Sequence, residues 1–248
     1  MSPVHRRGPV FLGSLLRDTE ATQEQKANGG DARHRLAALL WEHLSAMDSP
    51  LWQGPVSSAG AALPIQVVRD PLGKPHLLVG ERRGPAISFS EGGGAVWAAL
   101  CGDESEIGID VAEADEFQGD YPLHRVFHAQ ELHHALRLTG GEAATAAAML
   151  WSAKEAIAKA LGCGFHLVEP RDIHVHPSVE GDGGYVFPVS LSRKAAERLP
   201  LAAGRPLWVR SLPRGKGWLS VAFLDGPRRG GDAQRRHSSA PWKRNADS

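Results

Sequence analysis

The chain has 248 residues, of which 42% are hydrophobic, with 28 basic and 28 acidic side chains and a formal net charge of zero. This length can bury a large core without disulfides or structural metals. The balanced charge provides no overall field that would attract nucleic acid or a membrane surface, so we expect neither as a partner and any anion site must be local.

The two cysteines, Cys101 and Cys163, form neither a disulfide framework nor a paired zinc motif. A reducing, cytoplasmic location fits this pattern best.

The first elements are a strand and a helix. The short apolar run up to Leu16 is interrupted by Gly13 and Ser14 and lacks a cleavage site, which favours a first β-strand over a signal peptide. Asp31 can cap a helix whose inner face is Leu36, Leu39, Leu40 and Leu44. No segment approaches the roughly 18 apolar residues of a membrane span.

Strands dominate the rest of the first half. A Pro-, Ser- and Gly-rich loop is expected over 49–64, and a Gly-rich hairpin turn over 91–94. The pattern predicts strands at 65–69, 76–79, 86–90, 95–100 and 106–112.

The second half repeats the order of helices and then strands. We expect helices at 128–138 and 142–161, a short helix within 192–199, and strands near 172–176, 184–190, 206–212 and 217–224. This content indicates an α+β fold. We place an N-terminal half at 1–102, a C-terminal half at 103–225 and a disordered basic tail at 226–248.

The most informative segment is the helix around Trp151. With about 100° of rotation per residue, Trp151, Glu155 and Lys159 lie on one stripe, opposite an apolar stripe that contains Ile157. Alone, this pattern is typical of a surface helix whose Glu155–Lys159 pair contributes only about 0.2–0.5 kcal/mol.

A second fragment changes this interpretation. Asp110 lies within the β-branched run 107–111, so a G-I-D motif precedes W-x-x-K-E-A-x-x-K by some forty residues. Together they resemble the 4′-phosphopantetheinyl transferases of the large, surfactin-synthetase-activating type. The segments 127–131, Gly73-Lys74-Pro75 and 87–90 (I-S-F-S) resemble further family motifs in the same order.

The resemblance implies a fold, an activity and partners. It implies a pseudo-dimer of two similar helix-plus-sheet halves in one chain, which needs no second copy, so we expect a monomer. The implied reaction moves 4′-phosphopantetheine from coenzyme A to a serine of an apo acyl or peptidyl carrier protein, with magnesium. The sequence does not name the carrier.

It also implies roles for individual residues. Asp110 and Glu155 would hold magnesium, for which hard carboxylate oxygens are suited, and Glu155 would also be the base. Lys159 would contact the phosphates, and Lys154 could place a second ammonium group there. Coenzyme A would contact the residues Gly73, Lys74, Pro75 and Ser88, while one of Arg33, Arg35, Arg69, Arg82 and Arg83, with Arg33 preferred, would hold its 3′-phosphate.

Ordinary structural roles remain open for several of these residues. Asp110 could be a strand-end carboxylate bound by backbone amides, and residues 73–75 a plain turn. Trp151 is expected to pack in the core, and His128, His133 and His134 to face solvent rather than a metal.

Two positions depart from the family pattern. Ala112 replaces a second strand carboxylate, and Glu113 lies on the opposite face of the strand. Phe89 replaces a histidine that could contact a phosphate. These departures favour the alternative hypothesis of a catalytically weak homologue that binds coenzyme A or a carrier protein without transfer.

Overall fold

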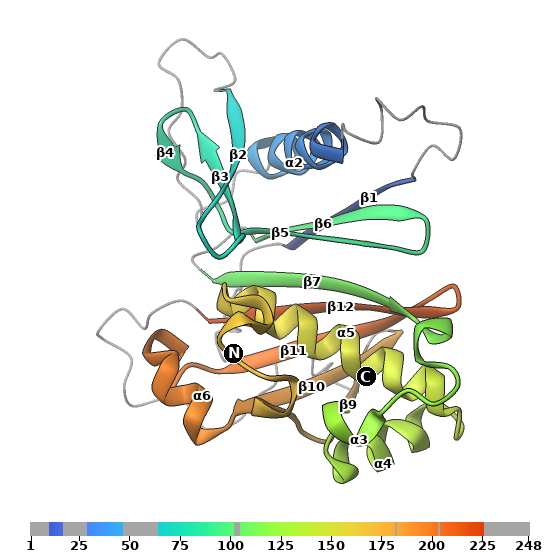
Figure 1. Ribbon diagram of the computed structural model, residues 1–248. Helices are drawn as coiled ribbons and strands as arrows, with labels where there is room; N and C mark the ends of the chain where they lie inside the picture. The colour runs from blue at the N-terminus through green and yellow to red at the C-terminus, as the bar shows by residue number, and fades with distance from the viewer. Residues whose placement is uncertain are drawn as a thin grey trace, which may run out of the picture.

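Two antiparallel sheets, each covered by a long helix, form the body of the molecule (Figure 1). The computed structural model describes residues 10–16, 29–46, 64–101, 105–181, 183–202 and 204–225. The predicted α+β class is confirmed. No helix within these ranges combines the length and the apolarity that a membrane crossing requires.

Within the described residues, the first half has one helix, α2, and six strands. Strands β1, β6 and β5 form its larger sheet, while β2, β3 and β4 form a separate small one. The elements are β1 Val10–Leu16, α2 Gly29–Ala46, β2 Ile65–Arg69, β3 Pro75–Val79, β4 Arg82–Arg83, β5 Ile87–Gly92 and β6 Ala95–Cys101.

The second half forms its own six-stranded sheet. Five of its strands lie in the order β7-β12-β11-β10-β8, and the sixth, β9, pairs with β10. Its strands are β7 Glu106–Glu113, β8 Ile173–Val175, β9 Val179–Gly181, β10 Gly184–Leu191, β11 Leu207–Arg214 and β12 Gly217–Leu224. Its α-helices are α3 Leu123–Val126, α4 Ala129–Leu138, α5 Ala143–Leu161 and α6 Arg193–Arg198. Short 3₁₀ turns span Ala114–Phe117, Gly164–His166, Pro170–Asp172 and Pro200–Ala202.

The two halves share a strand topology. In the first, β1 pairs with β6, the second strand of the hairpin β5–β6; in the second, β7 pairs with β12 of the hairpin β11–β12. This repeated pairing agrees with the expectation of two similar helix-plus-sheet halves. The expected boundary near residues 102–103, the tail 226–248 and most of the loop 49–64 lie outside the described residues.

Helix α2 packs on the first sheet through Leu36, Leu40 and Leu44, which are buried with strand residues in one apolar cluster. Two details differ from the sequence prediction. The helix begins at Gly29, before the expected cap at Asp31, and Leu39 is 45% exposed because it turns away from the sheet.

Strand β7 lies at the centre of the molecule and is buried on both faces. Ile107, Ile109 and Val111 join a cluster with residues of the first sheet, while Ala112 packs in the cluster around α5. This alternation places Gly108, Asp110 and Ala112 on the face toward α5.

The contact between β7 and α5 is unusually close at Gly108. A Cβ atom built there would lie 1.9 Å from the Ala156 carbonyl oxygen and 2.6 Å from the Ala160 nitrogen. Gly108 thus lets the helix that holds Glu155 and Lys159 approach the strand that holds Asp110.

We therefore predict that Gly108→Ala lowers the free energy of unfolding by roughly 1–3 kcal/mol, because both backbones would have to move apart. At an open, compatible position the same change would slightly stabilise the protein. Urea denaturation followed by circular dichroism measures the difference, and an unchanged midpoint would contradict the close packing.

Candidate functional site

A cleft of about 440 Å³ lies where the two halves meet. This volume is within the range of small-molecule sites. The first half contributes the lining residues Arg33, Arg69, Gly73, Lys74, Pro75, Ser88, Phe89, Ser90 and Glu91, and the second half contributes Asp110, Glu116, Trp151, Glu155, Lys159, Gly162 and Gly164. Most of the site residues expected from sequence are therefore brought together.

Asp110 is the most buried acid in the cleft, with 2% of its surface exposed. Its Oδ1 accepts hydrogen bonds from Lys159 Nζ at 2.6 Å and Ser90 Oγ at 2.8 Å. Its Oδ2 is buried and has no hydrogen-bond partner among the described residues while Glu155 is ionised, and a protonated Glu155 carboxyl group can donate a hydrogen bond to Asp110. A buried acceptor without a partner is costly, so Oδ2 is suited to a ligand that enters the cleft.

Glu155 lies one helical turn before Lys159, with 3.9 Å between its Oε2 and Lys159 Nζ. The pKa of Glu155 is raised to about 7: burial raises it most, the charge of Asp110 and a hydrogen bond to that carboxylate add to the increase, and the positive charge of Lys159 opposes them. A carboxyl group with a pKa near neutrality can both accept and release a proton, which suits a general base.

This raised pKa predicts a pH dependence of the metal-free protein. Because the folded state binds a proton that the unfolded chain releases near pH 4.5, stability should fall as the pH rises from about 4.5 through about 7. Thermal unfolding at pH 5 and pH 8 in a chelator, compared with Glu155→Gln, isolates this contribution. An equal loss in both proteins would contradict it.

Trp151 lies on the same stripe as Glu155 and Lys159, as expected, and lines the cleft. Its ring packs between Phe117, at 6.2 Å between centroids, and Phe165, at 5.4 Å. The core-packing role expected for Trp151 is thus present, and the same contacts fix the wall of the cleft.

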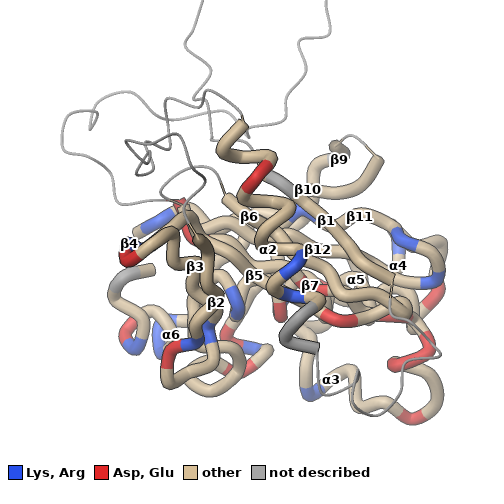
Figure 2. The backbone as a smooth tube through the Cα atoms, turned by 90° about the horizontal axis from the view of Figure 1, so that it is seen from above, with Lys and Arg blue, Asp and Glu red and all other residues tan. Residues whose placement is uncertain are grey.

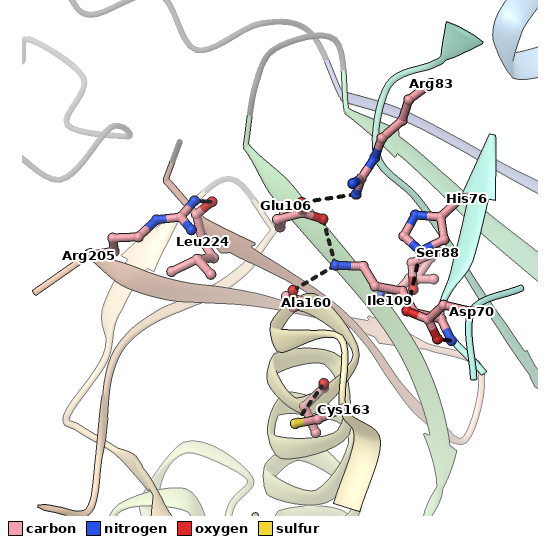
Figure 3. A network of polar contacts seen from close by, with 12 residues as sticks. Asp70, His76, Arg83, Ser88, Glu106, Ile109, Ala160, Cys163, Arg205 and Leu224 are labelled. Atoms are coloured by element: carbon pink, nitrogen blue, oxygen red, sulfur yellow. Dashed lines mark hydrogen bonds and ion pairs between the residues drawn. The ribbon is translucent and has the colours of Figure 1, made fainter. Parts of the chain in front are cut away.

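Two serines of β5 bridge to β7, although the strands belong to different sheets. Ser88 Oγ accepts the Ile109 N–H at 3.1 Å (Figure 3), and Ser90 Oγ accepts the Val111 N–H at 3.2 Å. Ser88 is 3% exposed, so its hydroxyl acts in this bridge as well as lining the cleft.

The Gly73-Lys74-Pro75 segment forms a tight turn whose Gly73 has a φ of 86°. Asp70 Oδ1 accepts the N–H groups of Leu72 and Lys74, both at 2.9 Å. The plain-turn interpretation therefore describes its conformation, and the same turn places all three residues at the cleft.

Lys74 connects the two halves. Its ammonium group donates to Glu106 Oε2 at 2.6 Å and to the Ala160 carbonyl at 3.3 Å, near the end of α5. Figure 3 shows Glu106 between Arg83 and the helix end at Ala160. A cation at the carbonyl end of a helix is also stabilised by the helix dipole.

Of the five candidate arginines, Arg33 and Arg69 line the cleft. Arg33 Nη2 pairs with Glu91 Oε1 at 2.8 Å, and Arg69 Nη1 donates to the Gly73 carbonyl at 2.9 Å. Arg35, Arg82 and Arg83 are exposed and lie outside it. Figure 2 shows acidic and basic positions interspersed over the backbone, in agreement with a local rather than global anion site.

Lys154 does not reach the cleft, in contrast to our expectation. It is completely buried, donates to the carbonyl oxygens of Pro170 at 2.8 Å and Ile173 at 2.7 Å, and lies 2.9 Å from Glu131 Oε2. Burial lowers the pKa of Lys154, and Glu131 partly offsets this. Neighbouring residues on a helix point about 100° apart around its axis. Lys154 therefore points into the core, although the adjacent Glu155 faces the cleft.

The histidines also differ from expectation. His128 stacks on His174 with 4.4 Å between ring centroids, and His134 Nε2 accepts the Ser178 N–H at 3.1 Å. Of the three histidines expected to face solvent, His133 is exposed, while His128 and His134 are half-buried. His128, Glu131 and His174 approach within metal-binding distance. However, the Glu131 carboxylate already accepts hydrogen bonds from the N–H groups of His128 and Val175. It also pairs with the ammonium group of Lys154, and this positive charge opposes the binding of a cation there.

Glu116 is a cleft residue that the sequence analysis missed. It lies in the 3₁₀ turn after β7, a connection that no strand or helix pattern predicted. Ala112 is on the Asp110 face as expected but is 1% exposed and packed beneath α5. The sequence did contain one signal for Glu116: an acidic residue that follows Asp110 by six positions, just beyond the end of the strand, can lie near the same site.

The donor set of the cleft fits a hard divalent cation. Asp110 offers an unpaired buried oxygen, and Glu155 and Glu116 add carboxylates nearby. Magnesium binds through a few carboxylates while retaining several waters. Asp110 and Glu155 would hold such a cation here.

The second half contains a segment similar to a known family. Residues 106–194 match the model of the 4′-phosphopantetheinyl transferase superfamily. This segment includes Asp110, Glu116, Glu155 and Lys159, whereas residues 73–90 lie outside it. The match does not distinguish the large type of the family from others. A comparison with curated proteins finds no match.

Two solved structures are similar to part of the chain. An ACPS–CoA complex of Chronobacterium ammoniagenes is 21% identical, with 50% of this chain and 98% of that chain covered and a TM-score of 0.39. An apo-ACPS structure of the same organism is 22% identical, with coverages of 48% and 95% and a TM-score of 0.39. At these values the likeness supports no functional conclusion.

Proposed function

We propose that the protein is a magnesium-dependent 4′-phosphopantetheinyl transferase of the large, single-chain type. Its substrates are coenzyme A and the apo form of an acyl or peptidyl carrier protein. The cleft, with Asp110, Glu155 and Lys159 in contact, is the observation that carries this proposal. The match of residues 106–194 supports it.

In the proposed reaction, the carrier's serine Oγ forms a bond to the β-phosphorus of coenzyme A. The bond from that phosphorus to its bridging oxygen breaks, and 3′,5′-ADP leaves with the electron pair. Glu155 takes the serine proton, directly or through a water. A bound magnesium ion would act as a Lewis acid and neutralise part of the negative charge of the diphosphate.

The remaining residues bind and orient the diphosphate and nucleotide. Lys159 provides a compact positive charge beside Asp110. Lys74 and the turn around it, with Ser88, line the cleft from the first half. Arg33 is our candidate for the 3′-phosphate, and it would exchange its contact with Glu91 for that anion.

Incubation with coenzyme A, magnesium and apo carrier proteins of several kinds tests the function. The intact mass of at least one carrier should increase by one phosphopantetheine group, and omission of coenzyme A should abolish the increase. No mass gain with any carrier would refute transfer.

A second candidate function is binding of coenzyme A or a carrier without transfer. Ala112 and Phe89 favour it, since Phe89 lines the cleft without any polar group to offer a phosphate. Calorimetric binding of coenzyme A, together with unmodified carriers, would select this alternative. Restoring a glutamate at 112 is a poor test, because that side chain would be buried beneath α5.

A further inference from the structure

The turn that follows β7 holds Glu116 at the cleft that also contains the Asp110–Lys159 pair. The adjacent Phe117 is 5% exposed and packs on Trp151, one helical turn before Glu155. Glu116 itself lines the cleft with Asp110 and Glu155. Packing of the turn on α5 therefore fixes the Glu116 backbone at the acidic end of the cleft.

Two reciprocal hydrogen bonds orient the Glu116 carboxylate. Its Oε1 accepts the Glu113 N–H at 2.7 Å, and the Glu113 side chain accepts the Glu116 N–H. Glu113 points away toward the β5–β6 turn, where its Oε1 is 3.4 Å from a Cβ built on Gly93. Glu113 thus orients the turn, while Glu116 Oε2 is left for a ligand.

An independent feature indicates that a ligand belongs here. Asp110 is 2% exposed and lines the same cleft, yet its Oδ2 has no hydrogen-bond partner among the described residues once Glu155 is ionised. Lys159 contacts only the other oxygen of Asp110. A cation at Oδ2 would satisfy this buried oxygen and reduce the repulsion among the three carboxylates.

We propose that Glu116, through Oε2, is the third carboxylate of a divalent-cation site with Asp110 and Glu155, in place of the strand carboxylate that Ala112 lacks. The assignment rests on the proposed magnesium-dependent function. It explains how a chain with a buried alanine at position 112 can still surround magnesium with three negative groups.

Magnesium titration of the full chain by calorimetry, without coenzyme A, tests Glu116 apart from turnover. Glu116→Gln keeps an oxygen for the Glu113 N–H but removes the charge. It should weaken magnesium binding by roughly 10- to 100-fold. The matched control Asp115→Asn, at an exposed position of the same turn that does not line the cleft, should bind magnesium as the unmodified protein does. Circular dichroism verifies that both variants are folded.

The outcomes separate this inference from the proposed function. If folded Glu116→Gln binds magnesium normally while Asp110→Asn does not, Glu116 is no ligand and the function stands. If the unmodified protein binds no magnesium yet modifies a carrier, the cation site is wrong. If it neither binds magnesium nor modifies carriers, the proposed function fails as well.

Discussion

Glu155→Gln is expected to lower the rate of phosphopantetheine transfer by roughly 10²- to 10⁴-fold, the usual contribution of a general base. The amide has nearly the same shape but cannot accept the serine proton, and it is a poorer magnesium ligand. Initial rates of carrier modification, measured by mass spectrometry at saturating coenzyme A, give the effect.

Glu142→Gln is the matched control, because Glu142 is exposed at the start of the same helix and its side chain makes no cap hydrogen bond. It should retain the full rate. A Glu155→Gln protein with normal turnover would show that another group takes the proton.

Lys154→Met is expected to lower the free energy of unfolding by about 3–5 kcal/mol, because it leaves the buried Glu131 carboxylate without its positive partner. In the protein that remains folded at low temperature, the KM for coenzyme A should be unchanged. Urea denaturation and steady-state kinetics measure the two quantities.

Two further variants make this result specific. Lys154→Met combined with Glu131→Gln should recover part of the lost stability, because no unpaired charge is then buried. Lys159→Met should show the opposite pattern, with a large kinetic defect and a smaller loss of stability, since Lys159 is 29% exposed at the cleft. Equal kinetic defects in Lys154→Met and Lys159→Met would contradict the separation of roles.

Periodicity predicted most elements of the fold because the core clusters follow it closely. The alternating pattern of 106–112 produced β7, and the long apolar stripe of 142–161 produced α5, each correct to within one residue. Residues on these two elements, Asp110, Glu155 and Lys159, were also brought together as expected.

Side-chain direction was less predictable where a helix is buried on most of its surface. Twelve residues of α5 are buried, including Lys154, so the assumption of a single charged, solvent-facing side was wrong for this lysine. Glu116 was missed for a different reason: its position depends on a 3₁₀ turn and on Phe117 packing against Trp151, contacts that no local periodicity encodes.

The serine bridge between β5 and β7 has an evolutionary consequence. Backbone pairing would lock two strands at one spacing, about 4.7–4.9 Å. Here the spacing between the opposing walls instead depends on the size of two hydroxyl side chains, Ser88 and Ser90. A substitution at either position would therefore change the spacing between β5 and β7, and with it the width of the cleft, without breaking the backbone pairing within either sheet.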